Sequence, residues 1–90
     1  MMPLFALICR DKPGALQIRQ DNRADHLEFL KTGQIFIAGP LIEDGDMRGS
    51  LVVIEAEDLA AARTWAAGDP YAAAGLFESV QISEWKKVIG

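Results

Sequence analysis

Strand-like and helix-like segments alternate along the 90 residues in the order βαββαβ, and this order restricts the fold more than any other feature of the sequence. The expected strands are the apolar or alternating segments 4–9, 35–42, 49–56 and 76–82. The expected helices are segments 15–32 and 59–67, which lack proline and glycine and are followed by Gly33 and Gly68. Glycine directly after a helix is a common stop signal. The order predicts an α+β fold of the ferredoxin-like, split βαβ type.

Turn-forming residues divide the middle of the chain into a hairpin. Residues 43–46, with the sequence Glu-Asp-Gly-Asp, separate two strand-like segments that should pair antiparallel. Gly39 and Pro40 interrupt the strand before this turn, and proline cannot donate to a central ladder. We therefore place this strand at an edge and interpret Gly39-Pro40 as a bulge. Within the first helix, Asp21-Asn22 marks the place where a break would fall.

The two expected central strands are apolar on both faces. In the split βαβ motif both helices cover one face of the sheet, and strands one and three lie in its middle. Segments 4–9 and 51–54 do not alternate as a sheet with one wet face should. An identical sheet is the simplest cover, so we predict a four-stranded antiparallel sheet in a homodimer, a dimeric α+β barrel. The alternative is that short apolar runs are only ambiguous strand signals.

Composition limits the classes of partner. A formal net charge of −4 opposes binding to nucleic acid or to an anionic membrane surface. Cys9 is the single cysteine, so no internal disulfide can form. The apolar start, residues 1–9, lacks a basic flank and is shorter than the ~18 residues of a membrane span. We expect one domain over residues 1–90, located in the cytoplasm.

His26 is the first candidate catalytic residue. It is the only histidine, and histidine is the residue type that most readily exchanges protons near neutral pH. At 100° per residue, Arg19, Arg23 and His26 lie within roughly a quarter of the helix circumference. This cluster lies beside an apolar stripe predicted to face the core, formed by Leu16, Leu27 and Leu30. Two guanidiniums beside an imidazole can bind a small carboxylate or enolate while the histidine moves a proton. Alternatively, the arginines form ion pairs with Asp21 or Asp25 and the histidine is structural.

Asp69 is the second candidate, and it has two possible roles. An acidic residue followed by proline is typical of a helix N-cap and first helical position, so Asp69-Pro70 can be purely structural. A carboxylate on a rigid turn can also orient an imidazole and fix its tautomer. No metal site and no cofactor are expected, because one histidine and scattered carboxylates give no ligand spacing. Cys9 is interpreted as a small buried hydrophobe.

Three short motifs and a C-terminal one occur together in an order that resembles the YCII-related family of YciI-like proteins. They are Arg19-x3-Arg23-x2-His26-Leu27, Ala38-Gly39-Pro40-Leu41, Asp69-Pro70-Tyr71-x2-Ala74-Gly75 and Trp85-Lys86-Lys87. The resemblance spans almost the whole chain and implies a dimeric α+β barrel similar to muconolactone isomerase. It also implies that the family's proposed histidine and aspartate active site corresponds to His26 and Asp69, with Arg19 and Arg23 at its arginine positions.

Two classes of function remain open at this point. Assigned chemistry in the family includes a dehalogenase-like enzyme of chlorinated aromatic breakdown, but a shared fold does not transfer a substrate. The residues favour a cofactor-independent enzyme, an isomerase, lyase or hydrolase acting on a small anionic compound. The rival is a non-catalytic small-ligand-binding or accessory dimer. Turnover distinguishes the two.

Overall fold

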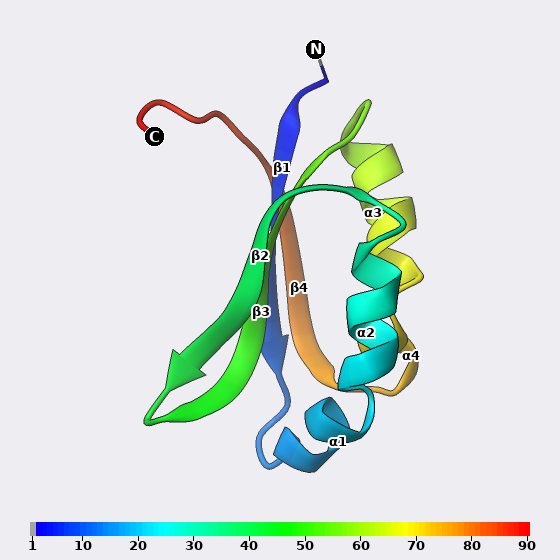
Figure 1. Ribbon diagram of the computed structural model, residues 1–90, viewed down its shortest axis with the longest axis vertical. Helices are drawn as coiled ribbons and strands as arrows, with labels where there is room; N and C mark the ends of the chain where they lie inside the picture. The colour runs from blue at the N-terminus through cyan, green and yellow to red at the C-terminus, as the bar shows by residue number, and fades with distance from the viewer. Residues whose placement is uncertain (1) are drawn as a thin grey trace.

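The computed structural model describes residues 2–90, which form one antiparallel sheet with helices on one side (Figure 1). The elements are β1 (Leu4–Asp11), α1 (Leu16–Asp21), α2 (Arg23–Leu30), β2 (Gln34–Glu43), β3 (Asp46–Glu55), α3 (Leu59–Ala67), α4 (Pro70–Ala73) and β4 (Phe77–Trp85). The strand order is β2-β3-β1-β4, which puts β1 and β3 in the centre. The predicted ferredoxin-like α+β fold is confirmed.

The first helical segment is broken at Asn22. This residue ends α1 and begins α2, and its side-chain amide donates to the carbonyl of Ile18 in the preceding turn. Such local bonds to backbone groups are the reason that asparagine favours helix ends over helix interiors. The break separates Arg19 on α1 from Arg23 and His26 on α2, so they do not share one continuous helix face.

The β2–β3 hairpin follows the expected turn chemistry but not the expected bulge. Asp44 and Gly45 both have positive φ, 52° and 82°, as a two-residue hairpin turn requires. The edge position of β2 is confirmed. The bulge predicted at Gly39-Pro40 is wrong, because Pro40 pairs in register with Ser50 and the register shifts lie elsewhere in β2, around Phe36 and after Leu41. An edge strand tolerates a proline whose missing N–H has no partner strand.

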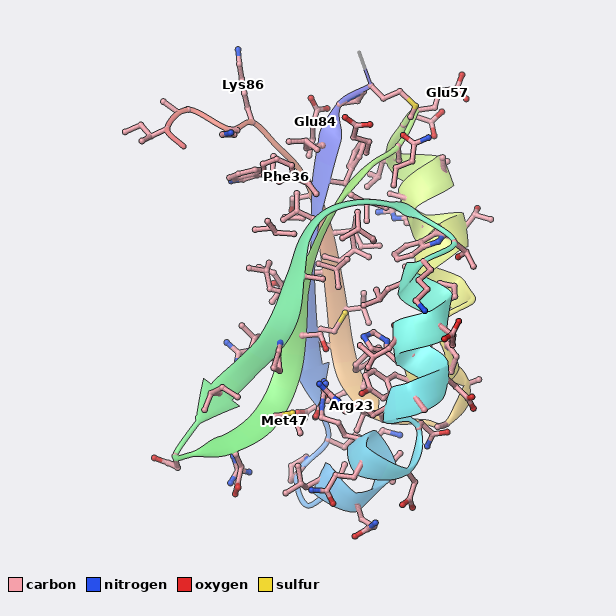
Figure 2. The ribbon with its side chains drawn as sticks, viewed as in Figure 1. Arg23, Phe36, Met47, Glu57, Glu84 and Lys86 are labelled. Atoms are coloured by element: carbon pink, nitrogen blue, oxygen red, sulfur yellow. The ribbon has the colours of Figure 1, made fainter. Side chains whose placement is uncertain are left out.

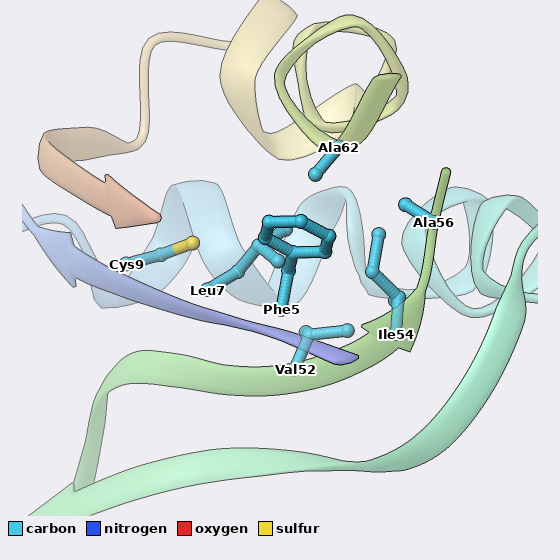
Figure 3. Close-up of a cluster of buried hydrophobic side chains, with 7 residues drawn as sticks. All are labelled: Phe5, Leu7, Cys9, Val52, Ile54, Ala56 and Ala62. Atoms are coloured by element: carbon cyan, nitrogen blue, oxygen red, sulfur yellow. The ribbon is translucent and has the colours of Figure 1, made fainter. Parts of the chain in front are cut away.

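The core lies between the sheet and the helices (Figure 3). Its main cluster consists of Phe5, Leu7, Cys9, Val52, Ile54, Ala56 and Ala62. A smaller cluster of Ala15, Tyr71 and Leu76 closes the end near α1 and α4. The last strand was predicted to start at Leu76 with alternating inward and outward side chains, and this prediction is wrong at its beginning. Leu76 lies before β4, and the pairing of β1 with β4 shifts by one residue next to Asp11. Because of this shift, both Phe77 and Ile82 face the core.

The other face of the sheet carries apolar side chains without a helix over them. Ala6 pairs with Val53, and Ile8 with Leu51, on the side opposite to the helices. Phe36, labelled in the upper part of Figure 2, lies near Trp85, with ring centroids 6.3 Å apart. Ile8 is 37% exposed, so part of this surface is left open. No helix within residues 2–90 has the length and hydrophobicity to cross a membrane.

Candidate active site

A small cavity of about 150 Å³ lies between the helices and the sheet. Its lining comes from α1, α2, β2, β3 and α4: Arg19, Arg23, His26, Leu27, Leu30, Ala38, Gly39, Pro40, Met47, Ser50, Val52 and Tyr71. A larger hollow of about 480 Å³ lies at the end of the sheet near residues 10–16. Neither His26 nor Asp69 lines that hollow, so we locate the candidate chemistry in the smaller cavity.

His26 and Asp69 meet beside this cavity. The imidazole Nδ1 lies 2.9 Å and 3.1 Å from the two carboxylate oxygens of Asp69, and both residues are buried. The predicted proximity of the pair is confirmed. An Nδ1–H donated to Asp69 leaves Nε2 as the free ring nitrogen. Within residues 2–90 every fully buried side-chain polar atom has a hydrogen-bond partner. Nε2 has none, so it keeps some accessible surface, and His26 lines the cavity.

Asp69 is a helix cap and the orienting carboxylate at the same time. Its Oδ1 accepts the backbone N–H of Tyr71 at 2.9 Å, and Pro70 occupies the first position of α4. The same oxygen is the closer acceptor for His26. The two roles that sequence reasoning treated as alternatives therefore coexist, and the position of His26 depends on the start of α4.

Tyr71 fixes the plane of the His26 imidazole by contacting the face of the ring, whereas Asp69 contacts its edge at Nδ1. Its ring stacks on His26 with centroids 4.0 Å apart and an interplanar angle of 14°. Tyr71 is itself 1% exposed and is held edge-on by Phe77 at 5.9 Å. Burial raises the pKa of the Tyr71 hydroxyl, against the opposing charges of Arg19 and Arg23. The phenol therefore remains protonated at neutral pH.

Arg19 is buried and held by a carboxylate that sequence reasoning did not consider. Its Nε and Nη2 donate to the two oxygens of Asp11 at 2.7 and 2.8 Å, and Nη2 also donates to Ser50. The ion-pair alternative thus applies, with Asp11 in place of Asp21 or Asp25. Burial opposes the charged form of Arg19, but the hydrogen bonds and charge of Asp11 outweigh it and raise its pKa.

Arg23 differs from Arg19 in exposure and in ion pairing. It is exposed, lines the cavity and makes no ion pair with any group in residues 2–90. Figure 2 shows Arg23 and Met47 on the helix side of the sheet. Leu27, predicted to face the core together with Leu16 and Leu30, is 42% exposed at this cavity. The break at Asn22 explains this exposure of Leu27. Leu16 lies on α1 whereas Leu27 and Leu30 lie on α2, so the three leucines do not form one stripe.

Cys9 lies in the core behind the site. Burial raises its pKa to about 12, helped by the negative charge of Asp69, so the thiol is protonated and unreactive at neutral pH. Within residues 2–90 no three His, Cys, Asp or Glu side chains gather in a way that could hold a metal ion. The groups present at the cavity suit an organic anion.

The match to a family model covers residues 3–86, and that model describes the YCII-related domain. The chain belongs to the YCII-related family. Among family relatives, Protein YciI of Escherichia coli O6:H1 is 36% identical over 94% of this chain and 98% of its own length. An uncharacterised protein of Haemophilus influenzae is also 36% identical, over 93% of this chain and 97% of its own length.

A solved structure is similar over nearly the same range. It is 5-chloro-2-hydroxyhydroquinone dehydrochlorinase (TftG) from Burkholderia phenoliruptrix AC1100, in complex with 2,5-dihydroxybenzoquinone. The TM-score is 0.85 at 36% sequence identity, and the match covers 92% of this chain and 93% of that chain. This YCII-related chain thus shares its fold and more than a third of its aligned residues with an enzyme.

Proposed function

We propose that this YCII-related protein is a small cofactor-independent enzyme in which His26 transfers a proton to or from a small anionic organic compound. The observation that carries the proposal is the His26–Asp69 pair at 2.9 Å, beside a cavity that His26 lines. Asp69 would hold the imidazole in the tautomer whose Nε2 carries a lone pair and would stabilise the imidazolium that forms. Arg19 and Arg23 would supply positive charge for the ligand.

The similarity to TftG supports a reaction on a hydroxylated ring. That enzyme's name gives it the removal of chloride from a chlorinated hydroxyhydroquinone, and its structure contains a dihydroxybenzoquinone. In such compounds a ring carbon lies next to an enolic or phenolic oxygen. An acid can add a proton to that carbon while the oxygen becomes a carbonyl, and a base can then remove a proton from the same carbon and return the charge to oxygen. A cavity of about 150 Å³ fits one small ring. The single thiol also agrees with our placement of the protein in the cytoplasm.

Hydrogen–deuterium exchange provides the test. In D₂O, the protein is expected to accelerate the replacement of the ring hydrogens of 2,5-dihydroxybenzoquinone above the buffer rate, as followed by loss of their proton NMR signal. The rival function, a non-catalytic binding module, gives broadened or shifted ligand signals and thermal stabilisation of the protein without accelerated exchange. Exchange at the buffer rate for this compound and for related enolic and phenolic anions contradicts the proposal.

We also propose that the protein is a homodimer joined through the helix-free face of the sheet. That face carries Ile8, Leu51 and Ile37, and Ile37 is 49% exposed. Exposed apolar side chains in the middle of a sheet are typical of a self-complementary interface. The helices cover most of the other side of the sheet, so the helix-free face is the larger apolar surface for a second copy.

Ile8→Glu is expected to dissociate this dimer, since it would place an unpaired charge in the apolar interface. Light scattering at micromolar concentration should then give the monomer mass, whereas the wild type gives twice that mass. Val80→Glu is the matched control, because Val80 is similarly exposed, at 43% against 37%, and lies on the helix side of the sheet. A wild type that is monomeric, or an Ile8→Glu variant that remains dimeric, overturns the proposed interface.

A further inference from the structure

We propose that the segment after the last strand, residues 86–89, crosses from one copy of this chain to a second copy and inserts Val88 and Ile89 into an apolar groove on strand β2 of that copy. The inference rests on the proposed homodimer and goes beyond it, because it names the segment that each copy gives to the other and the surface that receives it. The segment then acts as a reciprocal arm that holds the two copies together.

Val88 and Ile89 are the most exposed large hydrophobic residues within residues 2–90, at 86% and 92%. They follow β4, which ends at Trp85, and Figure 1 shows this part of the chain running to the side of the sheet opposite to the helices. Removing apolar side chains from water is favourable in proportion to the area that is buried. Two adjacent side chains of this kind are therefore suited to contact another apolar surface.

A shallow groove of about 230 Å³, here called the β2 groove, lies on the same side of the sheet. All of its lining residues are apolar: Ile37, Ala38, Gly39, Pro40, Leu41 and Leu51. Ile37 pairs with Val53, and Gly39 with Leu51, which puts the groove on the helix-free face. Gly39 leaves it open, because a Cβ added there would meet no atom within 4 Å. The groove thus has the chemistry and the space to receive aliphatic side chains.

The start of the segment is held on the helix-free face. Trp85 pairs with Leu4, which shares its face with Ile8 through the alternation of β1. The Trp85 ring lies 6.3 Å from the ring of Phe36, and the Lys87 ammonium lies 5.2 Å from the centroid of the same ring. The chain therefore leaves its own sheet only after Lys87, on the side where a second copy would pack.

The strand order explains why the segment of one copy meets the groove of the other. β2 and β4 are the opposite edges of the sheet, in the order β2-β3-β1-β4. When two identical sheets face each other about a two-fold axis parallel to their strands, β4 of each copy lies over β2 of the other. Such an interface uses the same contact twice, as closed two-fold dimers do.

The segment is long enough for this contact. Val88 lies three residues after Trp85, a span of about 10 Å in extended chain. Gly39 lies three residues from Phe36 along β2, which is also about 10 Å. A segment that starts at the level of Phe36 can therefore place Val88 and Ile89 at the β2 groove.

The charges beside the segment fit the same arrangement. Lys86 and Lys87 precede the apolar pair, and neither forms an ion pair within residues 2–90. Glu55, which pairs with Leu4 at this end of the helix-free face, also has no ion-pair partner in that range. A two-fold axis along the strands keeps equivalent ends of the sheets together, so the lysines of one copy approach Glu55 of the other.

The first test places charges on the segment. Val88→Asp/Ile89→Asp is expected to weaken the Kd of the dimer by about 10- to 100-fold, because two aliphatic side chains that would be buried in the groove become charged. Sedimentation velocity over a dilution series measures the change. Val88→Ile/Ile89→Val keeps the apolar character and is the matched control, which should dimerise like the wild type. Both residues are exposed in the single copy, so circular dichroism should show an unchanged fold.

A second test identifies the groove and the copy. Gly39→Cys/Ile89→Cys, treated with a mild oxidant, is expected to form a covalent dimer on a non-reducing gel, since Gly39 has room for a side chain. Cys9, the only cysteine of the unaltered chain, is buried and does not compete. Ile89→Cys alone, and Arg63→Cys/Ile89→Cys with its second thiol on α3, are the controls and should remain at the monomer mass.

The two tests separate this contact from its alternatives. A disulfide within one copy, seen as the monomer mass with both engineered thiols lost, shows that the segment folds onto its own β2 and overturns the proposal. Covalent dimers of Ile89→Cys alone, or no disulfide at all in the Gly39→Cys/Ile89→Cys variant, also overturn it. If the aspartate variant dimerises as tightly as the wild type, the arm is wrong and the proposed homodimer stands. A wild type that is monomeric at micromolar concentration contradicts the homodimer and this inference together.

Discussion

Asp69→Asn is expected to lower the rate of proton transfer by about 10²–10⁴-fold, the usual cost of losing acid–base catalysis. The asparagine oxygen can still accept the N–H of Tyr71, so the cap on α4 is largely kept. Its NH₂ group then takes the place of Oδ2, which lies 3.1 Å from Nδ1 of His26. A donor there opposes the tautomer that leaves the lone pair on Nε2, and the negative charge that stabilises the imidazolium is lost. The rate is measured by the deuterium exchange of a ring hydrogen.

His26→Ala is the companion variant and should lose the same activity without any change in the cap. Circular dichroism and thermal unfolding verify that both variants keep the fold. Asp69→Ala is the contrasting change, because it removes both the orienting carboxylate and the cap, which alone contributes about 1 kcal/mol. Full activity in His26→Ala, or in a folded Asp69→Asn, shows that the pair is not catalytic.

Asp11→Ala is expected to lower the free energy of unfolding by about 3–5 kcal/mol, because it leaves the buried guanidinium of Arg19 without its counter-charge. Both side chains of this pair are almost inaccessible, with 3% and 4% of their surface exposed. A loss of this size is a large part of the stability of any small domain. Urea unfolding at a fixed protein concentration measures it, since dimerisation makes stability depend on concentration.

Glu43→Ala provides the matched control for the buried pair. Its carboxylate lies 2.8 Å from Arg10, a distance close to that of the Arg19–Asp11 pair, but about half of each side chain is exposed. The loss there should stay below about 1 kcal/mol because water screens exposed pairs. Asp11→Asn, which keeps acceptor geometry but not charge, should fall between the two. Equal losses at Glu43 and Asp11 contradict the importance of burial.

The sequence predicted the element order, the edge position of β2 and the meeting of His26 with Asp69, because these depend on local patterns and on a motif order. It did not predict the partner of Arg19. Strand one was expected to end at residue 9, whereas β1 continues to Asp11 and carries this carboxylate beneath α1. Polar residues at a strand end resemble a loop, and only tertiary contact shows that one of them is buried.

Tyr71 was also missed as a site residue, although it stood inside a quoted motif. Its importance comes from stacking on a histidine 45 positions earlier in the chain, which no periodicity within α4 can show. An aromatic residue directly after an acidic residue and proline is the one local signal available. The bulge predicted at Gly39-Pro40 is wrong for a different reason. A local rule for proline in strands predicted a bulge there, but the edge strand β2 contains the proline without one.

One oxygen of Asp69 contacts His26 and also caps α4, and this affects which substitutions selection for stability would retain. Active sites usually carry groups whose removal makes the protein more stable, so gains in stability tend to cost function. Here the oxygen that orients His26 also starts α4, and α4 carries the buried Tyr71. Under the proposed function, a substitution that removes the aspartate would lower stability together with activity. Screens for thermal robustness would therefore retain this carboxylate, and loss of the His26–Asp69 pair would have to begin at His26.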